Sequence, residues 1–365
     1  MKRILSVFCL LAFAIGVSAV DRQPTTDYVY ASGLQYDNEY EAFHFDVLLE
    51  GQNYYSAYGL DIQLPEGMEV IEDEYGIFVE MIKTIYPTFG RQKEYTHSVT
   101  PSFPYPDDHS HLRAACISTQ NADLTATSGP LFSVYVNVNY QANAWPLGTI
   151  KVYAVELNKV GAPFDAPDQE TIVLLHSGET TLPLNISSTA QWSTCILPFS
   201  AAIPEGVKAY TTEKNDEQYI YLKEAESLEA YTPYILYSET GYSGNISGTV
   251  AASGYPETGC VKSGYLCGAI VPQTVTEGYV LQKQMEGVKF YAIAEGDSFN
   301  IPAGKCWMQL PEDALAKFLG FKIEGTDGIS TTVVPASKIG FDISGRQAIS
   351  HKGLLIKDGK KTLNP

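Results

Sequence analysis

The stretch FHFDVLLEGQNYYSAYGLDIQLPEGMEV, residues 43–70, decides the fold. Apolar residues occupy alternate positions from Phe43 to Leu49 and again from Tyr58 to Leu64, and the residues between them are largely polar. A period of two places one set of side chains on a buried face and the other in water, which predicts two half-buried strands joined as a hairpin. Pro65-Glu66-Gly67 ends the second strand, because proline presets φ and glycine tolerates the exit.

The same pattern returns along the whole chain. The cleanest alternation runs from Phe132 to Tyr140, and the short connection at 285–287 predicts a hairpin over 279–293. Many short strands separated by turn signals are typical of a β-sandwich. One turn sequence recurs with proline in second place and glycine in fourth, which predicts type I turns at 64–67, 203–206 and 301–304.

Composition and charge limit the setting. The chain has 365 residues, 45% of them hydrophobic and 12% aromatic, which fits a folded protein with two domains and tails. Its 25 tyrosines favour strands, and their hydroxyl groups allow them to lie partly in water at surfaces and interfaces. The formal net charge of −18 argues against nucleic acid or an anionic membrane as a partner, because both require basic patches.

The first 19 residues have the pattern of a signal peptide. Lys2 and Arg3 form the charged end, an apolar run follows from Ile4 to Val17, and small residues precede a cleavage site near Ala19. The apolar run is too short to span a bilayer, and no later segment approaches its length. The sequence therefore predicts a mature protein that is secreted or on the outer cell surface, without a transmembrane segment.

Composition shifts divide the rest of the chain. A stretch rich in Ser, Gly, Glu and Thr around 177–182 separates two blocks of strands, and GTDGIST at 325–331 has the composition of a linker. These shifts predict an all-β protein with a β-sandwich over 20–177, a second β-rich domain over 178–323, a linker over 324–332 and a C-terminal tail over 333–365 that holds one hairpin.

Three parts of the chain resemble known families. The strands at 45–67, with those at 131–136 and 148–152, resemble the cohesin-like (carbohydrate-binding-module-like) β-sandwich over residues 25–175. Residues 182–323 resemble a β-rich module of secreted and surface proteins of Gram-negative anaerobes, with matching pieces at 192–195, 198–199, 203–210 and 301–305. The tail at 341–347 and 352–356 is similar to a shortened type IX secretion sorting signal, although Leu355 stands where tyrosine is common. A plain terminal hairpin is the alternative for the tail.

The sequence offers little evidence of catalysis or metal binding. The sequence around Ser243 lacks the final glycine of a nucleophile elbow, and no HExxH, Walker, CxxC or Rossmann pattern occurs. Residues 107–111 place His109 and His111 beside two aspartates, but no further ligand is evident, so we interpret them as a solvated loop and predict no metal site. The acidic run at 72–74 leaves calcium open, and no other cofactor is predicted.

Loop aromatics are the predicted binding residues. Tyr54, Tyr55 and Tyr58 lie at and just beyond the first predicted hairpin connection, and Phe103 and Tyr105 lie in the proline-rich loop at 101–106. Exposed rings stack on sugars or anchor protein partners. The alternative is that each ring covers its own loop.

Five cysteines remain after the leader, and the predicted compartment permits disulfides. Cys260 and Cys267 flank a six-residue segment that a bridge would close as a short hairpin. The alternative is two separate buried thiols. Since five is an odd number, at least one cysteine is unpaired within the chain.

Together these features predict a secreted or surface-attached, non-catalytic binding or adhesion protein whose partner is a protein or glycan of the cell envelope. Two alternatives stay open. One is an accessory glycan-degrading enzyme with two unrecognised carboxylates, because such acids can be far apart in sequence. The other is a structural, fimbria-like subunit that assembles through an unpaired strand edge.

Overall fold

A computed structural model describes residues 22–365 apart from 74–75, 83–84, 90–93, 160–161, 216–218, 286, 311–317, 324–339, 343–346, 349–352, 358–359 and 365. The described residues form strands, turns and loops without any helix, so the all-β prediction is confirmed. Among them there is accordingly no helix with the length and apolar character needed to cross a membrane. The predicted leader over 1–19 and the predicted linker over 324–332 lie outside the described residues.

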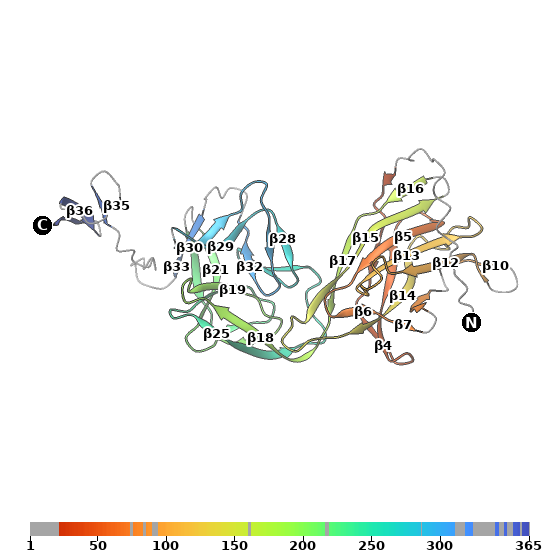
Figure 1. The fold of residues 1–365 in the computed structure, drawn as a ribbon, viewed down its shortest axis with the longest axis horizontal. Helices are drawn as coiled ribbons and strands as arrows, with labels where there is room; N and C mark the ends of the chain where they lie inside the picture. The colour runs from red at the N-terminus through yellow and green to blue at the C-terminus, as the bar shows by residue number, and fades with distance from the viewer. Residues whose placement is uncertain are drawn as a thin grey trace.

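The N-terminal part is a β-sandwich (Figure 1). One sheet has the order β1-β16-β15-β5-β13-β12, with β17 on β15: β1 (Gln23–Pro24), β16 (Ala162–Asp165), β15 (Leu147–Lys159), β5 (Ala57–Gln63), β13 (His111–Ser118), β12 (His97–Ser102) and β17 (Gln169–Leu174). The other has the order β2-β4-β14-β6, with β3 on β4 and β9 on β14: β2 (Tyr28–Ala31), β4 (Ala42–Glu50), β14 (Gly129–Val138), β6 (Met68–Val70), β3 (Gln35–Asp37) and β9 (Val79–Met81). Two small ribbons add β7 (Glu72–Asp73) with β8 (Gly76–Ile77) and β10 (Thr88–Phe89) with β11 (Glu94–Tyr95).

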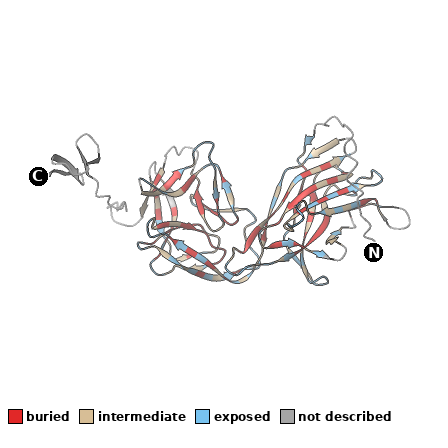
Figure 2. Cartoon of the chain, in the orientation of Figure 1, coloured by how far each residue is buried: buried red, intermediate tan, exposed pale blue. Residues whose placement is uncertain are grey.

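The opening stretch supplies one strand to each sheet. In β4, Phe45, Val47 and Leu49 are buried, and in β5, Leu60 and Ile62 are buried, so the predicted alternation is confirmed for these residues. It is wrong for Phe43, which is 39% exposed because it lies at the start of β4, paired with Tyr36 of β3. The buried side chains belong to one core cluster. Figure 2 shows the buried parts of the strands in red. The predicted hairpin is wrong, because β4 pairs with β2, β3 and β14 while β5 pairs with β13 and β15. The connection at 51–56 therefore crosses from one sheet to the other.

The strands after β17 form a second unit. Its main sheet has ten strands in the order β19-β24-β21-β22-β33-β30-β29-β32-β27-β26: β19 (Trp192–Cys195), β24 (Tyr234–Tyr237), β21 (Lys208–Asn215), β22 (Tyr219–Glu224), β33 (Phe318–Ile323), β30 (Gly287–Ala292), β29 (Tyr279–Gln284), β32 (Cys306–Met308), β27 (Leu266–Ala269) and β26 (Cys260–Ser263). Three ribbons flank it: β18 (Gly178–Ile186) with β25 (Tyr242–Val250), β20 (Ala201–Ala202) with β23 (Ser227–Leu228), and β28 (Gln273–Val275) with β31 (Phe299–Ile301). The hairpin predicted over 279–293 is present as β29 and β30.

The ten-stranded sheet curls on itself. Thr194 Oγ1 of β19 accepts a hydrogen bond from the backbone N–H of Cys306 at 2.9 Å and donates one to the Cys306 carbonyl at 3.2 Å. These bonds bring the first strand of the sheet against β32, and the space inside is filled by apolar side chains such as Ile196, Leu266 and Phe290.

The recurring proline–glycine turns differ from the predicted type. Gly67, Gly206 and Gly304 have φ of +83°, +79° and +82°. Each turn is closed by a hydrogen bond from the N–H of the residue after glycine to the proline carbonyl: Met68 to Pro65, Val207 to Pro204 and Lys305 to Pro302. Glycine is thus the third residue of the turn with positive φ, which is the type II geometry and not type I.

Trp145 links the sandwich to the second unit. It lies between β14 and β15, and its Nε1 donates a hydrogen bond to the Ile270 carbonyl at 2.5 Å. A Cβ atom added at Gly304 would lie 3.1 Å from the Trp145 ring, so glycine at this position leaves room for the indole. Leu147 of β15 and Ile172 of β17 also belong to the core cluster of the second unit. The two units therefore share packing.

Replacing Trp145 with alanine is expected to lower the free energy of unfolding by about 2 kcal/mol, because it removes ring packing and leaves the Ile270 carbonyl without its donor. Trp145→Phe keeps a ring but loses the N–H, so about 1 kcal/mol is expected. Urea unfolding measures both variants. Equal stability of wild type and Trp145→Ala would show that the indole does not hold the units together.

The described part of the tail contains four paired strands, whereas the sequence predicted only one hairpin. They pair in the order β35-β34-β36-β37: β35 (Gln347–Ala348), β34 (Gly340–Asp342), β36 (Gly353–Lys357) and β37 (Lys360–Asn364). The resemblance to a sorting signal stays a prediction, as do the predicted domain boundaries.

Candidate functional site

The structure separates the predicted binding aromatics into buried and exposed rings. Tyr54 is 50% exposed, whereas Tyr55 is fully buried and Tyr58 is 2% exposed. The expectation that Tyr55 and Tyr58 belong to an exposed surface is wrong, because the connection at 51–56 crosses between the sheets and carries Tyr55 into the core. The Tyr58 hydroxyl lies 2.8 Å from the Tyr86 hydroxyl inside that core.

A buried carboxylate fixes this connection. Asp27 accepts hydrogen bonds from the N–H groups of Gln52 and Asn53 at 3.1 and 3.2 Å, from Asn53 Nδ2 at 2.9 Å and from the Tyr55 hydroxyl at 2.6 Å. Burial alone would raise the pKa of Asp27, but the bonds from Tyr55, Asn53 and Gln52 together lower it below 3.8. Burial raises the pKa of Tyr55 to about 12. Tyr55 is therefore a structural residue.

The proline-rich loop presents one predicted ring to solvent. Tyr105 is 59% exposed and packs edge-on against His111 at 5.3 Å between ring centroids. Phe103 is half-buried and stacks on His109 at 4.5 Å. The alternative that a ring covers its own loop therefore describes Phe103, and Tyr105 stays a candidate contact residue.

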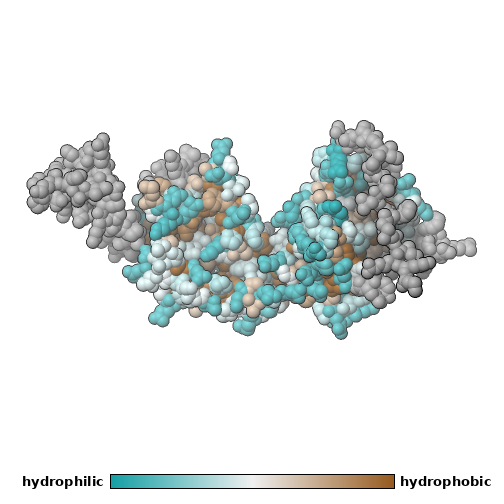
Figure 3. Space-filling view, viewed as in Figure 1, coloured by the Kyte–Doolittle hydropathy of each residue, from teal (hydrophilic) through white to brown (hydrophobic). Residues whose placement is uncertain are grey.

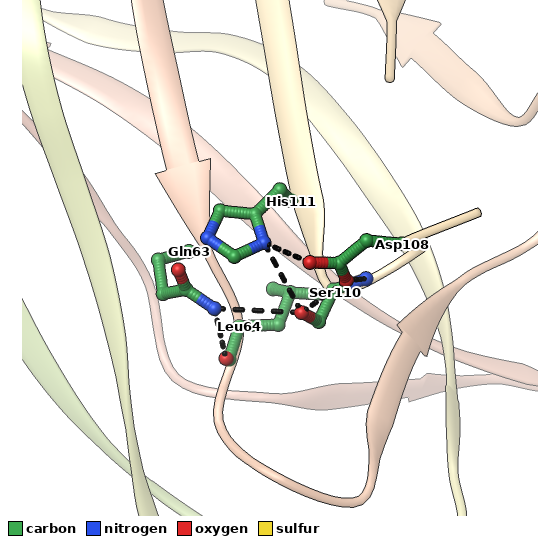
Figure 4. A network of polar contacts seen from close by, with 5 residues as sticks. All are labelled: Gln63, Leu64, Asp108, Ser110 and His111. Atoms are coloured by element: carbon green, nitrogen blue, oxygen red, sulfur yellow. Dashed lines mark hydrogen bonds and ion pairs between the residues drawn. The ribbon is translucent and has the colours of Figure 1, made fainter. Parts of the chain in front are cut away.

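A Ser, His and Asp set at the end of this loop is not arranged for catalysis (Figure 4). Asp108 Oδ2 lies 2.6 Å from His111 Nδ1, and Asp108 Oδ1 accepts a 2.6 Å hydrogen bond from the Ser110 hydroxyl. In a catalytic triad, serine and carboxylate contact different imidazole nitrogens. Here Ser110 Oγ is also nearest to Nδ1, at 3.4 Å, so the imidazole cannot relay a proton between the two groups. The set closes a turn, and Gln63 Nε2 adds a 3.4 Å contact to Ser110 Oγ.

A pocket of about 430 Å³ lies between this loop and the type II turn after β5. Its lining includes the carboxylates of Glu66, Glu69, Asp107 and Asp108. Hydrogen bonds from Ser110 and the contact with His111 lower the pKa of Asp108. Over the described residues, His, Cys, Asp and Glu side chains do not gather in threes at a spacing that would hold a metal ion.

The largest group of exposed rings lies elsewhere, on the hairpin of β3 and β4, and was missed from the sequence. Tyr36, Tyr40 and Phe43 are 51%, 45% and 39% exposed. We call residues 35–44 with these three rings the aromatic hairpin. Tyr36 and Phe43 are opposite each other in the register and pack edge-to-face at 5.1 Å. Since side chains alternate along a strand, they lie on one side of the hairpin.

Tyr40 lies on the other side, supported by two rings beneath it. It packs edge-to-face on Phe78 at 5.0 Å and on Tyr135 at 5.1 Å, and Phe78 and Tyr135 stack at 4.2 Å. The Tyr135 hydroxyl donates to Asp37 Oδ2 at 3.2 Å and lies 3.4 Å from Glu80 Oε2. Burial and these two carboxylates raise the pKa of Tyr135, and the charge of Glu80 raises the pKa of Tyr40.

The turn of the aromatic hairpin is held in a fixed shape. Asp37 Oδ1 accepts hydrogen bonds from the N–H groups of Glu39 at 2.7 Å and Tyr40 at 3.2 Å. Glu41 has φ of +53°, a left-handed conformation that costs a non-glycine residue free energy. The exposed rings therefore stand on a preorganised support, which lowers the entropy lost when they bind a partner.

The predicted bridge between Cys260 and Cys267 is absent. Both are free thiols, as are Cys116, Cys195 and Cys306. The β26–β27 register places Cys260 opposite Ala269 and Cys267 opposite Lys262. Diagonal partners of this kind are about 7–8 Å apart, beyond the Cα separation of a disulfide. Burial raises the pKa of Cys267 to about 11, which makes its thiol unreactive.

Comparison with known proteins gives only distant similarity. No protein-family model matches the sequence, and no curated protein matches it. The chain is similar to a non-cellulosomal cohesin from the hyperthermophilic archaeon Archaeoglobus fulgidus, with 13% identity and a TM-score of 0.27 over 41% of this chain and 92% of that chain. It is also similar to the type II cohesin dyad from the adaptor ScaA scaffoldin of Acetivibrio cellulolyticus, with 8% identity and a TM-score of 0.23 over 80% and 97%.

A third similar structure is the full-length major pilin SpaD from Corynebacterium diphtheriae, with 11% identity and a TM-score of 0.23 over 47% of this chain and 42% of that chain. Identities and TM-scores this low assign neither a family nor a function. A function for this chain has to be inferred from its own side chains.

Proposed function

We propose that this chain is a non-catalytic binding protein of the cell exterior, and that its aromatic hairpin anchors a protein partner of the cell envelope. The observation that carries the proposal is the exposure of Tyr36, Tyr40 and Phe43 on one short hairpin. Aromatic side chains supply large contact area at low entropic cost and dominate the binding energy of protein interfaces. The predicted leader supports the exterior location.

The ring geometry favours a protein over a glycan. Tyr36 and Phe43 lie on one side of the hairpin, where they meet edge-to-face, and Tyr40 lies on the other side, edge-to-face with the buried Tyr135. A sugar chain stacks on rings that share one flat face, whereas a hairpin with rings on both sides fits into a groove. Glu39, Glu41 and Glu80 are exposed around it, so the groove of the partner is expected to be apolar with a basic rim.

Photo-crosslinking tests the proposal. A benzophenone amino acid at position 36 is expected to capture one envelope protein, and the same group at the equally exposed Tyr54 serves as the control. The captured protein is then produced pure and its binding is measured directly. Equal capture from both positions, or binding only on a glycan array, would overturn the choice of surface or of partner.

The two alternatives predict other results. An accessory enzyme would release products from envelope glycans, and a structural subunit would self-associate at high concentration. Turnover assays and sedimentation of the purified chain separate both from a monomeric binding protein.

A further inference from the structure

A second pocket, of about 270 Å³, opens to solvent between β19 and the hairpin of β29 and β30 in the second unit. The pocket is lined by residues of β19, β29 and β30 and of the turn after β31. The surface of the second unit shows brown apolar areas between teal polar ones (Figure 3). The pocket is separate from the aromatic hairpin, which belongs to the sandwich.

The charged side chains that line this pocket are Lys283 and Lys305, and its lining contains no carboxylate. This is unusual in a chain with 42 acidic and 24 basic residues. Lys283 Nζ donates to the Thr189 carbonyl at 2.7 Å, and Lys305 Nζ donates to Ser193 Oγ at 3.0 Å and the Thr194 carbonyl at 3.3 Å. Neither lysine forms an ion pair within the described part of the chain.

These contacts leave positive charge and donor capacity in the pocket. An ammonium group has three N–H donors, and its neutral partners here do not compensate its charge. A carboxylate bound in the pocket would supply the missing charge through short, charge-assisted hydrogen bonds from these lysines.

The rest of the lining is mixed. Ser193, Thr194 and Gln282 are polar, and the apolar part includes Leu281, Val288 and Pro302. Trp192 also lines the pocket, but its ring is 9% exposed and already packs on Phe321 at 4.5 Å and Tyr237 at 4.7 Å. No free aromatic face is left for a sugar, and the apolar part of the lining favours an anion that carries apolar carbons over a bare phosphate.

We propose that this pocket binds a carboxylate on a short aliphatic body, with Lys283 and Lys305 holding the carboxylate and Leu281, Val288 and Pro302 lying against the body. The small volume limits the ligand to about one amino-acid residue. Two sources share this chemistry: the C-terminal residue of a peptide, and a free branched-chain acid.

Saturation-transfer NMR titration of the full chain tests the site with three probes. N-acetyl-L-leucine represents a peptide C-terminus, 4-methylpentanoate represents a free acid, and N-acetyl-L-leucinamide lacks the charge. The acids are expected to bind about tenfold more tightly than the amide, and more weakly as salt is raised. The tighter of the two acids identifies the source.

Lys283→Met is expected to weaken acid binding about tenfold, while Lys262→Met, on β26 outside the pocket, leaves it unchanged. Lys283 is exposed, so its replacement keeps the fold, and a melting curve checks this for Lys305→Met as well. Equal binding of leucine and leucinamide derivatives, no saturation transfer to any probe, or equal effects of the Lys262 and Lys283 variants would overturn the proposal.

Discussion

Replacing Asp27 with alanine is expected to lower the free energy of unfolding by about 3 kcal/mol. The carboxylate accepts four hydrogen bonds, from two N–H groups, an amide and the Tyr55 hydroxyl, and the residue is 2% exposed. Its removal takes away the carboxylate that accepts from the buried Tyr55 hydroxyl and frees the connection between the two sheets. Urea unfolding followed by far-ultraviolet circular dichroism measures the loss.

Asp165→Ala is the matched control. Asp165 lies on the surface and pairs with Arg22 at 3.4 Å, and exposed pairs contribute little. Its replacement is expected to change stability by less than about 0.5 kcal/mol. Similar losses in both variants would mean that the hydrogen bonds to Asp27 are not what fixes the connection.

The same carboxylate predicts an acid dependence of stability. Its hydrogen bonds lower the pKa of Asp27 in the folded state below 3.8, the value expected in the unfolded chain. The stabilisation is therefore fully present above about pH 4 and is lost as the pH falls through the folded pKa. Asp27→Asn is expected to flatten the decline of stability between about pH 5 and pH 2 relative to wild type. An unchanged slope would contradict the role of ionised Asp27.

Alternation could be predicted from the sequence because it depends only on neighbouring residues. Phe45, Val47 and Leu49 had to share one face wherever the strand went, and they do. The pairing of the strands could not be predicted in the same way, since β4 and β5 follow each other closely in sequence yet belong to different sheets. A short polar connection is compatible with a hairpin and with a crossing. The crossing is held by Asp27, a residue 25 positions before Gln52.

The dependence on contacts between residues distant in sequence also explains the wrong predictions for individual residues. Tyr55 looks like an exposed loop ring until the crossing places it in the core. The proline–glycine turns contain the expected residues, but their hydrogen bonds start one residue later than predicted. Both outcomes follow from contacts that are not local in sequence.

The aromatic hairpin had a weak signal in the sequence. Tyr135 falls among the polar residues of the strand with the cleanest alternation, so a ring on the outer face of that strand was predictable. Nothing local indicated that Phe78 and Tyr40 would pack on it, because β3, β4, β9 and β14 meet only in the folded sheet.

Replacing Tyr36 and Tyr40 together with alanine is expected to weaken binding of the crosslinked partner about 100-fold, because each exposed anchor ring is expected to contribute at least about 1.4 kcal/mol. The double variant loses the ring contacts of both tyrosines, so we expect its unfolding midpoint to fall by about 2–8 °C while the protein stays folded at 25 °C. Since the rings lie on opposite sides of the hairpin and do not contact each other directly, the single variants are expected to add up.

Isothermal titration calorimetry of the purified partner into wild type, Tyr36→Ala/Tyr40→Ala and Tyr54→Ala tests the aromatic hairpin most directly. Tyr54 is as exposed as Tyr36 but lies outside the hairpin, so its variant should bind like wild type. We expect loss of affinity in the double variant alone. Equal affinities of wild type and a folded double variant would show that the aromatic hairpin is not the binding surface.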